Sequence, residues 1–552
     1  MATSYLTPGV YVEEVPSASK PIEGVGTSVA AFVGLAPGGP VNQPMQISNW
    51  TQFATTFGDK RENKRENGPF LDGAYLAHAV YGFFHNGGTL CWVVRVGGSE
   101  DSPAPEAALP AASDASIEAF RVLALEGVEV EPKLELTEEA TPGSEASAQG
   151  GEQSSEGKSG EAEETSGKSS EGGGEKSEAT EPTYRLVVTA GSQSEEHTGL
   201  SLKKGKGYIA TKVNAASKLI KIEETGASLP AAQRAPAPGT YELTVPTIPS
   251  DAIAPTDFEG DVSQRTGIGG LAAVDEITMV CMPDLMTFAA NGDGAQVRDL
   301  QGKMIAHCEG TGDRMAIIDA PPDLRPQDVL DWRMQTAGYD SKFATLYYPW
   351  LEAMNPLTNQ PILIPPCGHL AGVWTRTDST RGVHKAPANE VILGVNGLAF
   401  QVTQEEQGGL NKAGINCIRS FRGRGIRVWG ARTLSSDPEW RYLNVRRLFN
   451  YVSESIMEGT QWAVFEPNDE RLWMQLRIAA TNFLTRTWRG GALFGATPEQ
   501  AFFVKCDAET NPPDVVEAGQ VVVEIGIAPV KPAEFVIFRI SQYTAGASEV
   551  AA

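Results

Sequence analysis

Cysteine and histidine are scarce in this chain of 552 residues, which has six of each. The cysteines are dispersed with no CxxC pair, whereas a disulfide framework belongs to short secreted chains with closely spaced cysteines. The histidines form no HExxH motif and no His/Cys spacing typical of zinc sites. We therefore predict free, mostly buried cysteines, no metal site built from local motifs and no cofactor.

Basic residues are also fewer than acidic residues, and long apolar runs are lacking. Lys and Arg total 45 against 69 Asp and Glu, a formal net charge of −24 that argues against nucleic acid as the main partner. No apolar run approaches the ~18 residues that span a bilayer, and the start of the chain lacks the basic and apolar regions of an export signal. We expect a soluble protein made in the cytoplasm, without direct membrane insertion.

Aromatic residues are missing from one acidic segment. Residues 131–181 contain no Phe, Tyr or Trp, and they hold fourteen Glu against four Lys. Such a segment cannot bury enough apolar surface to offset an ordering entropy of about 1–2 kcal/mol per residue. We predict a disordered acidic loop here.

Short β-like runs flank the acidic segment, with Gly, Pro and Ser between them. They indicate a β-rich domain inserted at residues 99–250, with Ala/Pro-rich stalks at 102–112 and 229–238. The runs are 120–125, 184–189, 208–213, 219–223 and 241–245.

Strand and helix patterns alternate outside the insert, which predicts an α/β fold with parallel strands and right-handed crossovers. Further on, Asp437 and Pro438 predict a helix start, Asn468 predicts the N-cap of a second helix, and that helix is expected to stop at Gly490. Two strand-like runs, 521–527 and 535–540, follow it. The expected strands of the α/β part are 28–35, 89–96, 277–282, 314–319 and 342–348, and its helices are 49–57, 72–84, 295–308 and 326–336.

A serine hydrolase is one alternative, because residues 26–31 resemble the nucleophile motif of subtilisins and His369 lies in a Gly-His-Leu-Ala-Gly motif. A triad needs Ser28, a histidine and a carboxylate in contact. However, no matching Asp motif is present, and Ser28 begins a strand-like run. Acid/base work by Asp319 and Asp323 has little support, since acids are common at strand ends and helix starts.

A group of arginines lies among Phe421, Trp429 and Trp440. Arginine with aromatics can bind nucleic acid, but its planar fork also pairs with carboxylates at protein interfaces. In so acidic a chain we favour ion pairs within or between subunits. The four candidate interface residues are Arg419, Arg422, Arg424 and Arg427, and Arg432, Arg441, Arg446 and Arg447 follow them.

Apolar extended segments lie near both ends of the chain. An exposed strand is either covered or adds to a neighbour's sheet. Exchange of strands in a head-to-tail sense builds rings or helices. The candidate intersubunit strand arms are Val10, Tyr11 and Val12 near the start and Phe535, Val536, Ile537 and Phe538 near the end.

Several dispersed motifs, in one order, resemble contractile phage tail sheath proteins and the sheath subunits of bacterial contractile injection systems. The opening YLTPGVYVEE and then GTSVAAFVG resemble the start of these proteins, and AGVWTRTD through RGVHKAPAN resembles their central signature. Further resemblances lie at residues 414–432, 440–447 and 483–495. The resemblance covers about 1–98 and 250–545, and the insert is not matched.

The resemblance implies a structural protein, not an enzyme: a sheath of stacked hexameric rings around an inner tube, which contracts to drive the tube through a target envelope. It implies homo-oligomers, contacts with tube, baseplate and cap proteins, and a place in an assembled phage tail or injection particle that lysis releases. Another self-assembling structural protein is the main alternative. The implied fold is a subtilisin-like α/β core with a β-rich insert and strand arms: arm 1–20, core 21–98 and 251–400, insert 99–250, C-terminal α/β sheath domain 401–519, and strand arm with tail 520–552.

Overall fold

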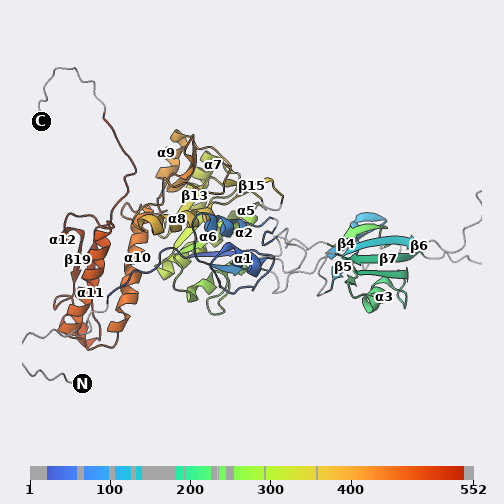
Figure 1. Ribbon diagram of the computed structural model, residues 1–552, viewed down its shortest axis with the longest axis horizontal. Coiled ribbons are helices and arrows are strands. Elements are labelled where there is room, and N and C mark those ends of the chain that lie inside the picture. The colour runs from blue at the N-terminus through green and yellow to red at the C-terminus, as the bar shows by residue number, and fades with distance from the viewer. Residues whose placement is uncertain are drawn as a thin grey trace, which may run out of the picture. The chain divides into compact units, whose positions relative to one another are not determined.

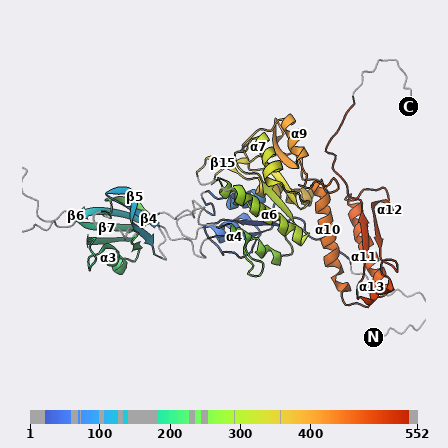
Figure 2. The same ribbon diagram turned by 180° about the vertical axis from the view of Figure 1, so that it is seen from behind.

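The computed structural model describes residues 21–58, 68–71, 73–97, 106–125, 132–139, 182–191, 193–225, 233, 235–243, 254–290, 292, 294–355 and 358–539. Contacts divide the chain into two compact units. The first comprises residues 1–60, 66–101 and 248–552, and the second comprises residues 61–65 and 102–247. Figures 1 and 2 show them from opposite sides.

An eight-stranded sheet forms the centre of the first unit, in the order β18-β17-β13-β12-β11-β1-β3-β2. Strands β17 to β3 in this order run parallel, and the edge strands β18 and β2 pair antiparallel with their neighbours. Their apolar runs are buried, as in parallel sheets covered on both faces. The bounds are β1 Ala30–Gly34, β2 Met45–Ile47, β3 Cys91–Arg95, β11 Met279–Cys281, β12 Met315–Asp319, β13 Ala344–Tyr348, β17 Ile415–Phe421 and β18 Gly425–Val428.

Helices connect and cover these strands, so the predicted mixed α/β class and the alternation over 277–348 are confirmed. A small sheet, β15-β14-β16, adjoins the core (Pro361–Ile364, Leu351–Met354 and Gly397–Leu398). The helices are α1 Trp50–Phe57, α2 Leu76–His85, α4 Pro255–Glu259, η3 Gly269–Ala273, α5 Leu285–Ala290, α6 Gly294–Thr311, α7 Pro326–Asp331, η4 Trp332–Ala337, α8 Cys367–Arg381 and α9 Gln404–Lys412.

Helices α2 and α8 pack unusually closely because glycines face the partner helix. A Cβ added to Gly368 of α8 would lie 2.3 Å from the carbonyl oxygen of Ala79. One added to Gly82 of α2 would lie 2.2 Å from Nδ1 of His369. The approach of the two backbones therefore requires these glycines.

The C-terminal part of the first unit is built on two long helices, α10 Leu443–Thr460 and α11 Glu470–Arg489, which lie side by side in both views (Figures 1 and 2). Their apolar faces enclose a second core that includes Ile22, Val452 and Phe483. The remaining elements here are η5 Gln461–Ala463, α12 Pro498–Ala501, β19 Phe502–Lys505, α13 Pro513–Glu517 and β20 Glu524–Ile527.

Two predicted helix starts were wrong by a few residues. The Asp437 carboxylate accepts from the backbone N–H of Glu439 in a local turn, and α10 begins later, at Leu443. The N-cap of α11 is Asp469, which accepts from the N–H groups of Arg471 and Leu472. The helix ends at Gly490, as predicted.

The second unit contains two antiparallel sheets, β4-β5-β9 and β10-β6-β7-β8, and one helix among its described residues. Its core includes Phe120, Leu134, Leu186 and Ile209. The bounds are β4 Glu106–Ala111, β5 Asp114–Ala124, β6 Lys133–Glu139, β7 Thr183–Ala190, β8 Gln193–Leu200, α3 Ile209–Ala216, β9 Ile220–Glu223 and β10 Gly239–Glu242.

Three expectations for this unit were wrong. Residues 208–213 are not a strand: Ile209 and Val213 are buried on one face of α3, a spacing of four. Residues 133–139 of the predicted loop form β6, whose Leu134 and Leu136 are buried. Part of the first predicted stalk is strand β4. Residues 131 and 140–181 of the predicted acidic loop lie outside the described residues.

All six cysteines are buried and free, as predicted. Within the described part of the chain, no helix combines the length and apolar character needed to cross a membrane.

Candidate functional site

Ser28 and His369, the candidate hydrolase pair, have separate structural roles. His369 lies on α8 against Gly82, and burial, its first cause, lowers its pKa to about 3. The carbonyl of Ser28 accepts from Thr375 Oγ1 at 3.3 Å. Among the described residues, no hydrogen bond joins Ser28 to His369 and no carboxylate contacts the imidazole. The pair lacks the geometry of a nucleophile and its base.

Buried carboxylates at the carboxyl ends of the strands cap helices. Asp284, after β11, accepts from the N–H groups of Leu35, Tyr75 and Leu76, the last two at the start of α2. Asp319, at the end of β12, accepts from the N–H of Cys367 at 2.9 Å, the first residue of α8. Burial raises the pKa of Asp284 to about 6 and that of Asp319 to about 7. At this edge of the sheet, where α/β proteins commonly bind ligands, both carboxylates therefore bind the protein's own backbone.

A buried ion pair joins the α/β core to helix α10. Arg447 of α10 donates to both carboxylate oxygens of Asp378 on α8, at 2.9 and 2.5 Å, and to the carbonyl of Thr27 at 3.1 Å. Thr27 Oγ1 also donates to Asp378, at 2.7 Å. Only 4% and 3% of the two charged side chains are exposed. The guanidinium also lies over the ring of Trp374. Three distant segments are therefore fixed at one charged contact.

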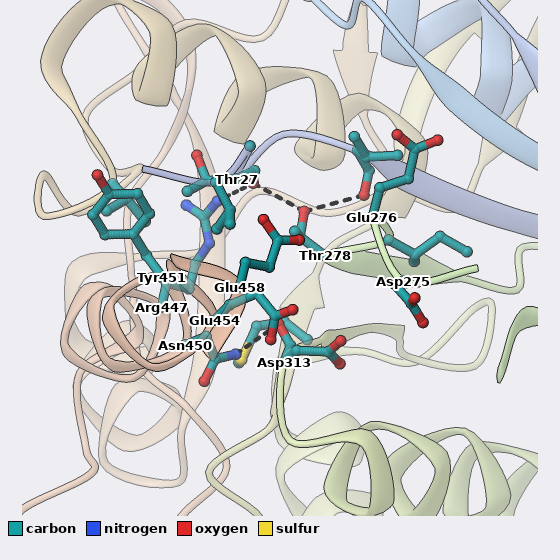
Figure 3. Close-up of a pocket in the computed structure, with 16 residues that line it drawn as sticks. Thr27, Asp275, Glu276, Thr278, Asp313, Arg447, Asn450, Tyr451, Glu454 and Glu458 are labelled. Carbon is teal, nitrogen blue, oxygen red and sulfur yellow. Dashed lines mark hydrogen bonds between the residues drawn. The ribbon is translucent and has the colours of Figure 1, made fainter. Parts of the chain in front are cut away.

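An acidic pocket of about 170 Å³ lies beside this ion pair (Figure 3). Its floor is formed at the amino ends of β1, β11 and β12, and α10 forms a wall. Glu454 and Glu458 extend from α10 toward Thr278 and Asp313 (Figure 3). The pKa of Glu454 is raised, first by burial and then by the charges of Asp313, Glu458 and Asp275. The pocket therefore holds carboxylates that repel one another. Its acidic lining residues are Asp275, Glu276, Asp313, Glu454 and Glu458.

The four candidate interface arginines lie on the hairpin of β17 and β18. Arg422 and Arg424 are exposed, and Arg419 and Arg427 are half-buried. Arg424 donates to Asn389 Oδ1 at 2.9 Å, and Arg427 donates to the Asn389 carbonyl at 2.6 Å. Arg419 donates to the side chain of Gln407 at 2.8 Å. In the described chain, none of the four forms an ion pair with a carboxylate.

Of the four arginines that follow, Arg441 is exposed, and the other three contact the interior of the first unit. Arg432 makes a two-pronged ion pair with Glu534, at 2.9 and 2.6 Å. Arg446 is buried over the rings of Phe343 and Trp440, and Arg447 forms the ion pair described above. The arginine-rich segment therefore contains two groups with different roles.

The C-terminal segment is anchored as far as Glu534 and exposed beyond it. The carboxylate of Glu534 also accepts from Asn411 Nδ2 at 2.7 Å, and the N–H of Val530 donates to the carbonyl of Ala492 at 3.2 Å. The next apolar side chains are 72%, 69%, 79% and 84% exposed, and they form no strand within the described chain. They are Phe535, Val536, Ile537 and Phe538. The N-terminal candidates Val10, Tyr11 and Val12 lie outside the described residues.

The acidic pocket was not predicted from the sequence. Glu454 and Glu458 are separated by four residues, so on a helix they lie on the same face, and like charges at this spacing are unfavourable. This pair of glutamates could therefore have indicated an acidic site from the sequence alone. Asp275 and Asp313 precede two separate strands, and only the folded sheet brings them to the same helix.

Comparisons with known proteins agree on one family. The family profile described as "Phage tail sheath protein central domain" matches residues 266–434, and "Phage tail sheath C-terminal domain" matches 435–542. Together they cover half of the chain.

Curated relatives include the tail sheath protein of Salmonella phage ViI, 28% identical over 250 residues, and that of Enterobacteria phage T4, 27% identical over 245 residues. These matches cover 41% and 42% of this chain but only 38% and 36% of the relatives. The tail sheath protein of Escherichia phage P2 is 26% identical over 296 residues, covering 52% of this chain and 70% of that protein.

Solved structures of similar fold include the sheath of the extracellular contractile injection system PVC in its contracted state, with a TM-score of 0.54 and 23% identity. That match covers 98% of both chains. The helical sheath of the anti-feeding prophage in its contracted state gives a TM-score of 0.55 and 23% identity, covering 98% of this chain and all of that one. At these identities the likeness establishes the fold.

Proposed function

Because this chain belongs to the phage tail sheath family, a family of structural proteins, we propose that it is a sheath subunit of a phage tail or contractile injection system. Subunits polymerise as stacked hexameric rings around an inner tube, with baseplate and cap proteins at the two ends. Contraction of the sheath drives the tube through a target envelope. The chain does no chemistry in this process, and it acts as part of an assembled particle.

The exposed C-terminal segment carries the proposal. Four consecutive apolar side chains, from Phe535 to Phe538, lie in water at about 70–85% exposure, although burying each would contribute about 1.5–3 kcal/mol. Their backbone has no strand partner among the described residues. A segment of this composition is stabilised when it adds to another sheet, and we propose that it does so on a neighbouring subunit.

The receiving sheet is proposed to be the β19–β20 pair. Two strands alone are marginally stable, and in the described chain neither strand pairs with a third. Phe503 of β19 is 54% exposed. An added strand would complete the hydrogen bonding of one edge and cover this ring.

Contraction requires two packings of similar free energy. Rigid units joined by exchanged strands suit such a change, since bistable packings differ by only a few kcal/mol and a small bias per subunit adds over many subunits. We also propose that the chain is organised into an N-terminal arm, a core, an insert, a C-terminal sheath domain and a C-terminal arm. The arm is 1–20, the core 21–98 and 251–400, the insert 99–250, the sheath domain 401–519, and the C-terminal arm with tail 520–552.

Negative-stain electron microscopy of the purified chain, with and without the inner tube protein, tests the proposal. We expect long hollow cylinders with stacked rings, and their loss in the variant Val536→Ser/Phe538→Ser, which removes two apolar side chains from one face of the added strand. The matched control is Phe465→Ser, which removes a fully exposed ring elsewhere and should leave the cylinders intact. Dispersed monomers under both conditions would refute the sheath function, and cylinders that never shorten would favour another self-assembling structural protein.

A further inference from the structure

The basic hairpin and the acidic pocket lie at opposite ends of the same parallel sheet. The pairing of β17 with β13 ends at Tyr348 and Cys417, and β17 continues to Phe421 before the turn into β18. Arg422 and Arg424 thus extend past the carboxyl ends of the strands. The pocket is lined by Val29, Thr278 and Met315, which stand immediately before or at the first residues of β1, β11 and β12. One subunit therefore presents positive charge at one end of its sheet and negative charge at the other.

The basic hairpin is preorganised for carboxylates. The guanidinium of Arg424 lies 5.5 Å from the centre of the Phe421 ring and 5.8 Å from that of Trp429. Its hydrogen bond to Asn389, and that of Arg427, fix both side chains against one loop. A fixed, planar donor loses less conformational entropy when it pairs with a carboxylate than a free side chain does.

The two arginines nearest the acidic pocket are held mainly by other groups. Arg447 lines the pocket, but its two terminal nitrogens donate to Asp378 and to the carbonyl of Thr27. Arg314 lies 3.2 Å from Asp313, but it is buried and donates to two backbone carbonyls. In the described chain, no ion pair reaches Glu454, Glu458 or Asp275.

A guanidinium suits this pocket better than a metal ion. Among the described residues, no three acidic, His or Cys side chains are close enough together to hold a metal. The carboxylates of Glu454 and Glu458 nevertheless face one space with Asp313 (Figure 3).

We propose that the arginine hairpin of one subunit, centred on Arg422 and Arg424, docks at the acidic pocket of a second copy of this chain. This inference rests on the proposed function, since it specifies one contact of the polymer. Two different surfaces that meet in this way make a heterologous contact, which propagates head to tail. Docking places cations beside Glu454 and Glu458, and it relieves the repulsion that these acids share in the free subunit.

Charge reversal tests the pairing. The first variant is Arg422→Glu/Arg424→Glu and the second is Glu454→Lys/Glu458→Lys, with Lys204→Glu/Lys206→Glu in the second unit as a matched control. Each full-length protein is assembled at the same concentration, and the polymer fraction is measured by sedimentation and negative stain. We expect each of the first two variants alone to lose polymer by about tenfold or more, because close interfacial charge pairs contribute strongly. An equimolar mixture of the two should recover polymers, since alternating subunits restore opposite charges at every contact.

The outcomes separate this inference from the proposed function. If the wild type assembles and both reversed variants assemble equally well, the pairing is wrong and the sheath function stands. If each variant fails alone and their mixture also fails, the two surfaces do not meet each other, and the pairing is again refuted. If the wild type itself never assembles, the proposed function is at fault. Circular dichroism melting curves matching the wild type establish that the variants are folded.

Discussion

Replacing Arg447 with Met should strongly destabilise the first unit. The substitution keeps an unbranched side chain but removes two hydrogen bonds to Asp378 and one to Thr27. The carboxylate of Asp378, only 3% exposed, then retains the hydroxyl of Thr27 but no counter-charge. Breaking a buried pair in this way costs about 3–5 kcal/mol.

Tryptophan fluorescence during urea unfolding measures this loss selectively. All ten tryptophans lie outside residues 102–247, so unfolding of the second unit is silent in this signal. Asp378→Asn in the Arg447→Met background removes the unpaired charge, and we expect it to recover about 1–3 kcal/mol. The matched control is Arg471→Met, an exposed arginine on α11, which should change the free energy of unfolding by less than about 0.5 kcal/mol. A loss below about 1 kcal/mol for Arg447→Met would show that the pair contributes little to joining α10 to the core.

Three further outcomes are expected. Burial raises the pKa of Asp319 to about 7, so the contribution of the protonated side chain to stability is complete below its ordinary pKa and is lost as the pH rises toward 7. Between pH 4 and pH 8, the free energy of unfolding of Asp319→Asn should therefore increase by about 3–5 kcal/mol relative to that of the wild type. Parallel pH profiles of urea unfolding for the two proteins would contradict this. Gly82→Ala should destabilise by about 1–3 kcal/mol, because its Cβ would clash with the His369 ring, and an unchanged melting temperature would mean that the ring moves freely. Glu534→Gln should leave the urea midpoint of the first unit nearly unchanged but speed proteolysis after residue 530 severalfold, because the two-pronged ion pair with Arg432 is lost. Equal cleavage rates in the variant and the wild type would show that the backbone contacts alone hold the C-terminal segment.

The core strands could be predicted because burial on both faces leaves continuous apolar runs. The expected strand at 28–35 contains β1, and the one at 314–319 differs from β12 by one residue. Such an apolar run indicates a buried strand even when the neighbouring strands in the sheet are not known. Helix starts were less predictable, since Asp437 satisfies a local turn while the start of α10 depends on packing against the core.

The candidate site was predictable only in part. The sequence indicated that arginines gather near residue 430, but it could not separate those that point inward from those that face water. Arg446 and Arg447 are adjacent in sequence and both buried, while Arg422 and Arg424 are exposed on a hairpin. The acidic pocket depends on the order of strands in the sheet, which places Asp275 and Asp313 beside the same helix. No local pattern carries that information.

The exposed C-terminal segment also has a consequence for the solubility of the free chain. Its apolar side chains form a short stretch of high β-propensity, the composition that promotes aggregation. Glu534 precedes this stretch and Arg539 follows it, so only four apolar residues stand between two charges. Flanking charges of this kind act as gatekeepers against uncontrolled stacking. Under the proposal that this segment adds to a neighbour's sheet, the flanking charges would limit its aggregation in the free protein, and affinity tags or fusions placed beyond residue 539 should preserve both charges.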